Sequence, residues 1–346
     1  MQPGFFAPFR RVGHTSVNGS ERIPLHDQAS YPPQFAGAIY KRLSRIACSS
    51  LMLLALAAPL PAVDMLYVTL GNSTIVSYDT TSGVGSTIAA SMNTFASTNL
   101  DNPRGLAFDS TGNLYAANTG NDTISKFNAS GGYVSNISSN LIGPQGLAFD
   151  TTGNLYAANY SNSTISKFNA SGNFLSQINS NLGNPFGLAF DSSGNLYAAN
   201  YVGSTISKFN SSGAYVSNIT TNLNGPVGLV FDSSGNLYAA NLNNSTISKF
   251  NSSGTFLSQI NSNLNIPVGL AFDSSGNIYA ANQGDSTISK FNSAGTFLTS
   301  WSTGSTQPIY LAFKPVTVPE PSTYALATIA TGVMAYLARR RKARTA

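Results

Sequence analysis

Charged and reactive side chains are both scarce in this sequence. Charged residues make up 9% of its 346 residues, whereas ordinary soluble domains contain roughly 25%. Between residues 64 and 316 there is no histidine, glutamate or cysteine, because His14, His26, Glu21, Glu320 and Cys48 all lie outside. Zinc is held mainly by Cys and His, and a general base is most often His or Glu. The central region therefore excludes a zinc site and a His or Glu base.

Most basic residues lie at the two ends of the chain. The whole chain has a formal net charge of +5, but residues 64–316 combine seven Lys or Arg with ten Asp, a net charge of −3. A surface that binds nucleic acid needs several basic residues on one face to replace counterions. We therefore expect no nucleic-acid partner.

Residues 41–62 have the pattern of a secretory signal peptide. Basic residues between Lys41 and Arg45 precede a mostly apolar run, 46–58, that is too short to span a bilayer. Small residues then allow cleavage after Ala57 or Ala62, of which we favour Ala62. Residues 1–40 carry no periodic pattern, and we interpret them as an unstructured extension or as the product of a start assigned too far upstream.

The central region is a repeat. Six prolines follow one another at intervals of 41 residues: Pro103, Pro144, Pro185, Pro226, Pro267 and Pro308. Within one unit, short aromatic or β-branched segments at 105–108, 113–118, 123–127 and 133–137 are separated by Asp, Ser, Gly and Asn turns. These segments predict a four-stranded antiparallel meander, and no window has helical periodicity. A period of this length predicts an all-β propeller, in which radial closure protects the sheet edges.

The two ends of the repeat determine the number of blades. Before Pro103, residues 65–69, 73–78 and 86–90 match the second, third and fourth strands of a unit, with an insertion after the last. After the fifth full unit, residues 309–313 supply a single first strand. Three strands plus one complete a sixth blade. We predict a six-bladed β-propeller over residues 63–316, closed by pairing of 309–313 with 65–69.

The C-terminal segment, 317–346, has three parts. The motif Val318-Pro-Glu-Pro-Ser-Thr323 precedes a mostly apolar stretch, 324–338, and a basic tail, 339–344. This order closely resembles the PEP-CTERM sorting signal. The resemblance implies an exosortase-type processing enzyme acting near Pro319, Glu320 and Pro321, transient association with the inner membrane, and export to the cell surface or extracellular matrix of a Gram-negative bacterium. The alternative, a permanent anchor with one transmembrane helix, stays open.

The repeat unit G-L-A-F-D-S-x-G-N-L-Y-A-A-N is similar to the NHL-type propeller repeat. Propellers of this kind include gluconolactonase-like lactonases, streptogramin-type lyases and the peptide-amidating lyase, whose sites use Glu, Asp and His. This chain departs from the pattern, because the NHL repeat commonly has Asp where five asparagines stand here: Asn118, Asn159, Asn200, Asn241 and Asn282.

Five turn aspartates and five strand lysines recur with the repeat. The aspartates are Asp109, Asp150, Asp191, Asp232 and Asp273, and the lysines are Lys126, Lys167, Lys208, Lys249 and Lys290. In the turn D-[ST]-[ST]-G-N we expect the carboxylate to accept backbone N–H groups while the Gly is left-handed. We expect no cofactor, with a calcium role left open. For the lysines we predict an interblade ion pair with a turn aspartate or plain solvation, with polyanion binding as the alternative.

Sequence variation is largely confined to one face of the disc. The turns between strands one and two and between strands three and four are nearly constant, and we call their side the constant face. The loops between strands two and three and the connections between blades vary, and we call their side the variable face. Loops on a rigid scaffold commonly carry binding sites. The candidate ligand-binding residues are Arg104, Gln145, Tyr160, Phe186, Tyr201, Leu242 and Gln283. Relaxed drift of the loops is an equal alternative.

These features predict an exported, non-catalytic scaffold. Its partner would be an extracellular polysaccharide or surface protein, in an exopolysaccharide or biofilm matrix. The alternative is an extracellular lyase or lactonase with an Asp-held divalent metal in the central channel.

Overall fold

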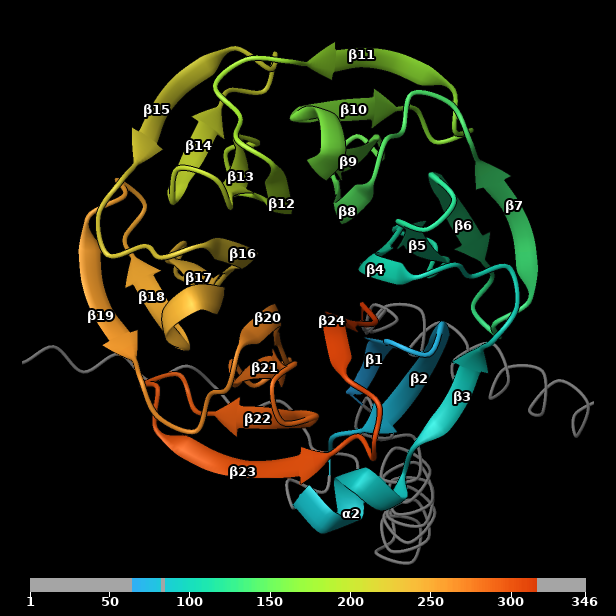
Figure 1. Cartoon of the computed structure of the whole chain (residues 1–346), viewed down its shortest axis with the longest axis vertical. Helices are drawn as coiled ribbons and strands as arrows, with labels where there is room; N and C mark the ends of the chain where they lie inside the picture. The colour runs from blue at the N-terminus through green and yellow to red at the C-terminus, as the bar shows by residue number, and fades with distance from the viewer. Residues whose placement is uncertain (1–63, 82–84, 316–346) are drawn as a thin grey trace, which may run out of the picture. The chain divides into compact units, whose positions relative to one another are not determined.

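The structure is a computed structural model that describes residues 64–81 and 85–315. These residues form six four-stranded antiparallel sheets arranged radially around a central axis (Figure 1). The predicted six-bladed β-propeller is confirmed. The extension 1–40, the signal peptide 41–62 and the C-terminal segment 317–346 lie outside the described residues.

In each blade the first strand of the repeat lies nearest the axis and the fourth lies at the rim (Figure 1). Blade 1 contains β24 (Pro308–Phe313), β1 (Met65–Leu70), β2 (Thr74–Asp79), the helix α2 (Gly85–Ala90) and β3 (Asn93–Ala96). Blade 2 contains β4 (Pro103–Phe108), β5 (Leu114–Asn118), β6 (Thr123–Phe127) and β7 (Tyr133–Ile137). Blade 3 contains β8 (Pro144–Phe149), β9 (Leu155–Asn159), the 3-10 turn η1 (Tyr160–Asn162), β10 (Thr164–Phe168) and β11 (Phe174–Ile178).

The remaining three blades repeat the pattern. Blade 4 contains β12 (Pro185–Phe190), β13 (Leu196–Asn200), β14 (Thr205–Phe209) and β15 (Tyr215–Ile219). Blade 5 contains β16 (Pro226–Phe231), β17 (Leu237–Asn241), the 3-10 turn η2 (Leu242–Asn244), β18 (Thr246–Phe250) and β19 (Phe256–Ile260). Blade 6 contains β20 (Pro267–Phe272), β21 (Ile278–Asn282), β22 (Thr287–Phe291) and β23 (Phe297–Ser302).

The hydrophobic core lies between neighbouring blades. The second strand of each full repeat, Leu-Tyr-Ala-Ala-Asn or its Ile variant, is buried along its whole length, because both faces of the sheet are covered by adjacent blades. Its two alanines bring the sheets close together, while a fully buried phenylalanine at the end of the third strand, such as Phe168 or Phe209, fills the wider space outside them. One repeat cannot bury these residues alone, so the blades depend on one another.

The ring is closed in the predicted way. β24 pairs antiparallel with β1, and the partners are Leu66 with Phe313, Tyr67 with Ala312 and Val68 with Leu311. The register shifts between Val68 and Leu70. The last strand of the ring thus completes the blade that begins it.

The fourth strand of blade 1 was predicted wrongly. Residues 86–90 were expected to form it, but they belong to α2, and the strand is β3 at Asn93–Ala96. The insertion therefore precedes the strand instead of following it. Ile88 of α2 is fully buried against Tyr78 and Trp301, so the helix extends the core of blade 1 towards blade 6. Burial of this side chain outweighs the low intrinsic stability of a helix this short.

Five glycines of the first strands bring the inner strands very close together. They are Gly105, Gly146, Gly187, Gly228 and Gly269. A Cβ atom on Gly105, Gly187 or Gly228 would collide with the backbone carbonyl oxygen of the next inner strand. At Gly269 it would lie 2.7 Å from the Cα atom of Tyr310. The sixth copy of this position is Tyr310, where the ladder to β1 is shifted.

Candidate functional site

The structure brings the variable loops together with the connections between blades. The backbone N–H of Tyr160 donates to the carbonyl of Gly143 at 3.1 Å, and that of Leu242 donates to the carbonyl of Gly225 at 3.1 Å. Each glycine lies in the connection that enters the inner strand of the same blade. Both kinds of variable segment therefore lie on one face of the disc, around the entrance of the central channel.

The constant face is formed by self-contained turns. In blade 2, Asp109 Oδ1 accepts the backbone N–H groups of Thr111 at 3.0 Å and Asn113 at 2.9 Å. Its Oδ2 accepts the amide of Asn113 at 2.8 Å, and Gly112 adopts a φ of 83°. The other four turn aspartates accept the corresponding backbone hydrogen bonds. The structural role expected for these carboxylates is confirmed.

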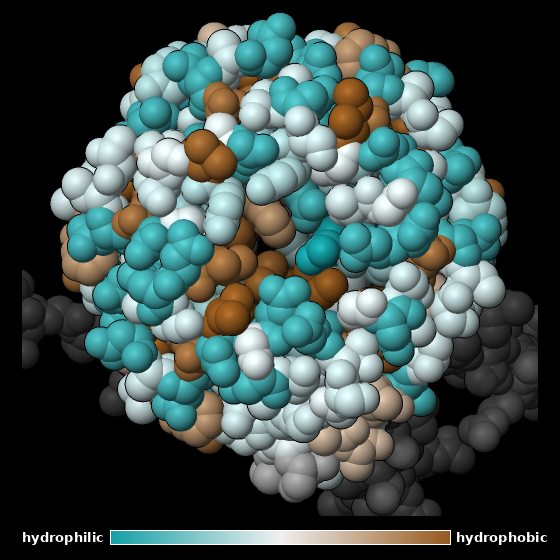
Figure 2. All heavy atoms as spheres, viewed as in Figure 1, coloured by the Kyte–Doolittle hydropathy of each residue, from teal (hydrophilic) through white to brown (hydrophobic). Residues whose placement is uncertain are grey.

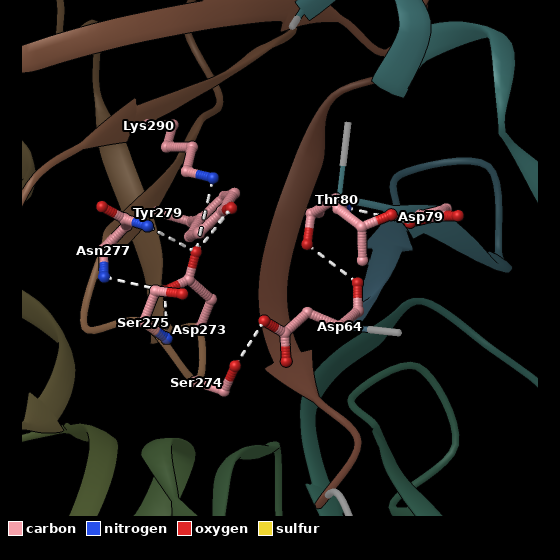
Figure 3. Close-up of polar contacts among 10 residues, drawn as sticks. Asp64, Asp79, Thr80, Asp273, Ser274, Ser275, Asn277, Tyr279 and Lys290 are labelled. Carbon is pink, nitrogen blue, oxygen red and sulfur yellow. Dashed lines mark hydrogen bonds and ion pairs between the residues drawn. The ribbon is translucent and has the colours of Figure 1, made fainter. Parts of the chain in front are cut away.

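The strand lysines pair with turn aspartates of their own blade. Lys126 Nζ lies 3.7 Å from Asp109 Oδ2 and 5.0 Å from the ring centre of Tyr115. The prediction of an interblade pair is wrong, because Lys126 is the register partner of Tyr115 and the turn that carries Asp109 joins β4 to β5. In blade 6, Figure 3 shows the same group, with Lys290 Nζ 3.4 Å from Asp273 Oδ2. Each of the five lysines thus contacts an aspartate and a tyrosine of its own blade.

Neighbouring blades also meet on this face. Asp273 accepts a hydrogen bond from the Tyr279 hydroxyl at 3.0 Å, and the hydroxyl of Ser274 donates to the carboxylate of Asp64 at 2.7 Å (Figure 3). The second of these bonds joins blade 6 to the residue that precedes β1. The constant face is thus used largely for internal contacts.

In four of the turns, hydrogen bonds favour the ionised form of the aspartate. Burial by itself would raise the pKa of Asp150, but hydrogen bonds from Asn154 and Thr152 outweigh it and lower this pKa to about 2. The pKa values of Asp109, Asp191 and Asp232 are also lowered, against the same opposing effect of burial.

We expect the propeller to keep its stability from neutral pH to about pH 5 and to lose it progressively below, because an unfolded aspartate titrates near 3.9. A carboxyl group with a lowered pKa binds fewer protons in the folded chain than in the unfolded chain, so protonation favours unfolding. This stabilisation disappears as the pH falls through the folded value, which is about 2 for Asp150. Urea unfolding followed by the fluorescence of Trp301 would measure it.

Asp150→Asn should weaken this acid dependence, because it removes a carboxyl group whose pKa is lowered by folding. Residues 64–316 contain no histidine. A marked fall in stability as the pH is lowered from about 8 to 5, a range in which only histidine among unperturbed side chains changes charge, would contradict the expectation.

The five departures from the NHL pattern have a structural reason. Asn118 is buried, and its amide donates to Thr123 Oγ1 at 3.0 Å and to Ser125 Oγ at 2.9 Å, while its Oδ1 accepts the backbone N–H of Asp101. The two hydroxyls already donate elsewhere, Ser125 to the carbonyl of Asn99 and Thr123 to Asn121 Oδ1. Both hydroxyl oxygens must therefore accept a hydrogen bond from residue 118. The amide N–H groups of asparagine can donate these bonds, whereas an aspartate carboxylate cannot. In each full repeat, this asparagine accepts a backbone N–H of the segment that leads into the first strand, and so holds that segment against the blade.

The predicted site residues fall into three groups. Tyr160, Phe186, Tyr201 and Leu242 form a half-buried apolar strip across blades 3 to 5. The rings of Tyr160 and Phe186 are 5.9 Å apart, and the Tyr201 hydroxyl bonds Asn243 Oδ1 at 3.3 Å. Gln283 contacts Gln307 at 3.4 Å in blade 6. Arg104 and Gln145 lie on the inner strands, the first half-buried and the second buried.

Sequence reasoning missed two residues at the channel. Tyr310 is buried in β24, and its backbone N–H donates to Thr69 Oγ1 at 2.9 Å. Thr69 Oγ1 donates in turn to the carbonyl of Arg104 at 2.9 Å. A signal was present for Tyr310, since it replaces the glycine of the other five repeats. Figure 2 shows a hollow at the centre of the variable face, bordered by apolar residues on one side and by hydrophilic residues on the other.

Carboxylates do not line the inner strands. The six segments Pro-Arg-Gly-Leu-Ala-Phe to Pro-Ile-Tyr-Leu-Ala-Phe contain no Asp or Glu. Within 64–81 and 85–315, no three Asp, Glu, His or Cys side chains form a group that could hold a metal ion. The turn aspartates lie at the constant face, where they bind backbone and lysine.

Comparison with known proteins identifies the C-terminal segment. A family model of the PEP-CTERM protein-sorting motif matches residues 317–342. The chain carries this sorting motif. The PEP-CTERM motif indicates export and membrane-associated sorting in Gram-negative bacteria, and it implies processing by an exosortase-type enzyme. No curated protein matches the chain.

Solved structures share the fold of the central region. The structure of a nidogen/laminin complex aligns with a TM-score of 0.63 at 18% identity, over 73% of this chain and 98% of that one. A streptogramin B lyase aligns with a TM-score of 0.55 at 16% identity, over 71% and 85% of the two chains. A catalytically inactive His-to-Ala variant of virginiamycin B lyase from Staphylococcus aureus, with quinupristin, aligns at 0.51 and 16%, over 60% and 72%. At these identities the likeness shows the propeller fold alone.

No helix of the described residues is long and apolar enough to cross a membrane. The apolar segment 324–338, for which a transmembrane helix was considered, lies outside those residues.

Proposed function

We propose that this protein is an exported, non-catalytic scaffold whose variable face binds an extracellular polysaccharide in an exopolysaccharide matrix. The observation that carries the proposal is the strip formed by Tyr160, Phe186, Tyr201 and Leu242 beside the channel entrance. Aromatic faces stack on the C–H faces of sugar rings, and the surrounding amides and hydroxyls can bond sugar hydroxyls. A surface protein is the second class of partner for this face.

The sorting motif supports the same assignment. The motif indicates export, which would bring the propeller into contact with extracellular polymers, and many copies in a matrix would raise the avidity of weak individual contacts. The constant face offers fewer free side chains to a ligand, because its aspartates, lysines and tyrosines contact one another. We do not propose the metal-dependent lyase, because the inner strands carry neither a carboxylate nor a histidine.

We expect Tyr160→Ala to weaken binding of the processed protein to exopolysaccharide from its own host by about tenfold, the loss typical of one stacked aromatic. The matched control is Tyr133→Ala, which removes the same side chain from the rim strand β7, where it is 43% exposed. Co-sedimentation with the purified polymer measures both variants. Equal weakening by the two substitutions would show that the variable face is not the binding surface.

A further inference from the structure

The two ends of the described ring lie side by side on the constant face. In every full repeat the first strand ends at an aspartate turn of that face, as β4 does at Asp109. β24 has the same place and direction in blade 1, because Phe313 pairs with Leu66 as the last residue of β4 pairs with the first of β5. The backbone N–H of Lys314 donates to the carbonyl of Met65 at 3.2 Å. The chain therefore leaves the ring beside the point at which it enters.

Contacts with blades 1, 6 and 2 hold this point in place. The carbonyl of Asp64 accepts the backbone N–H of Thr80 at 3.1 Å and its hydroxyl at 2.8 Å. The carboxylate of Asp64 accepts the hydroxyl of Ser274 in blade 6 (Figure 3). On the other side, a Cβ atom added to Gly112 in the turn of blade 2 would lie 3.5 Å from Cε of Lys314. Entry and exit are thus fixed to the constant face.

The connection from this point to the apolar segment 324–338 is short. Tyr324 is nine positions beyond Pro315, the last described residue, and nine extended residues span at most about 32 Å. To turn the variable face towards a membrane that holds this segment, the connection would have to pass from the innermost strand to the rim and then across the disc. Three strand spacings of about 4.8 Å and six residues rising about 3.3 Å each put that path at roughly 14 Å outwards and about 20 Å along the strands, before side chains are counted. The connection is too short for that path.

The sorting motif is held closer still. Pro319 is four positions beyond Pro315, so it lies within about 14 Å of that residue. An enzyme that acts near Pro319 must therefore approach from the side of the constant face. Charge gives this face no strong attraction of its own to an anionic lipid surface, because each of the five strand lysines pairs with an aspartate.

We propose that, until the sorting segment is cut, the propeller is held with its constant face towards the inner membrane and its variable face turned away. The short connection sets this orientation, not an affinity of the face for lipid. The exosortase-type enzyme then contacts the constant face around Asp64 and Lys314, while the variable loops stay open to the surroundings. The proposal does not depend on what the variable face binds.

Single cysteines measure this orientation, because residues 64–316 contain none. In the full chain with Cys48→Ser, Val202→Cys marks the variable loop of blade 4 and Ser192→Cys marks the constant turn of the same blade, across the ring from blade 1 (Figure 1). Both positions are exposed. Spheroplasts of host cells without the exosortase-type enzyme are treated with a bulky, membrane-impermeant maleimide polymer, and each labelling rate is divided by that of the same variant in detergent solution. We expect this ratio to be at least several-fold lower for Ser192→Cys than for Val202→Cys.

A longer connection distinguishes the tether from other causes of protection. An insertion of about twelve Gly and Ser residues after Pro315 forms a flexible linker and should make the two ratios equal. A second pair in blade 2, Ser110→Cys on the constant face and Asn121→Cys on the variable face, repeats the comparison at other exposed positions. Equal ratios without the insertion, or stronger protection of the variable face, would overturn the orientation. Protection of the constant face that persisted with the insertion would show that this face binds the membrane itself, and would overturn the role of the connection.

Discussion

A chain that ends before Pro308 is expected to lose cooperative unfolding and to aggregate. It lacks β24, the innermost strand of blade 1, and exposes β1 and the inner edge of that blade. Ile309, Tyr310 and Leu311 are all nearly fully buried. Burying each such side chain stabilises a fold by about 1.5–3 kcal/mol, so their loss is comparable to the roughly 5–15 kcal/mol that holds a domain folded. Unpaired strand edges then favour association with other chains.

The matched control is a chain that ends at residue 316, which also lacks the sorting segment but keeps β24 and the bond from Lys314 N–H to the carbonyl of Met65. It should unfold in a single transition. Circular dichroism melting and light scattering distinguish the two. A truncation before Pro308 that melted like the control would mean that the ring does not depend on closure by its last strand.

Gly228→Ala is expected to destabilise the ring by roughly 3 kcal/mol or more, at or above the upper end for overpacking of a core. The new Cβ would collide with the backbone carbonyl oxygen of Val268 on the next inner strand, which cannot move without displacing blade 6. Flexible side chains can relax around an added methyl group, whereas a strand paired on its other side cannot. Urea denaturation measures the change.

Gly71→Ala serves as the control, because the nearest atom to its Cβ would be the carbonyl oxygen of Gln307 at 3.8 Å, an ordinary contact. It should alter the free energy of unfolding by no more than about 0.5 kcal/mol. Similar stability of the two variants would show that the inner strands are less tightly spaced than the structure has them.

The period of the sequence was sufficient to predict the ring. The prolines stand 41 residues apart, and strands outside the five full repeats lie before Pro103 and after Pro308. Together these features predicted both the number of blades and the closure of the ring. Residues 86–90 were assigned to a strand because they stand where the repeat has its fourth strand. The buried contact of Ile88 with Trp301, which makes them a helix, joins residues more than 200 positions apart.

The site could be predicted only in part. Comparison of the repeats indicated the variable face and Arg104 as candidates. It could not predict how far each side chain there is buried or which groups it contacts. The pairing of Lys126 with Asp109 in its own blade follows from strand register, and the need for asparagine at 118 follows from which hydroxyls have already donated their protons. Neither can be read from composition or spacing. Tyr310 was visible as an exception to the glycine pattern, but its place in the channel required the fold.

The position of β24 also sets an order of events in secretion. This strand ends at Phe313, and the match to the sorting motif begins at residue 317. In the order of synthesis, blade 1 stays a three-stranded sheet until β24 is made, whereas each of the other five blades consists of four consecutive strands. Folding is therefore completed only as the sorting motif arrives. Cleavage near Pro319 would leave β24 in the released protein, because this strand ends at Phe313. A product cut within the ring would lack β24, and its blade 1 would stay incomplete.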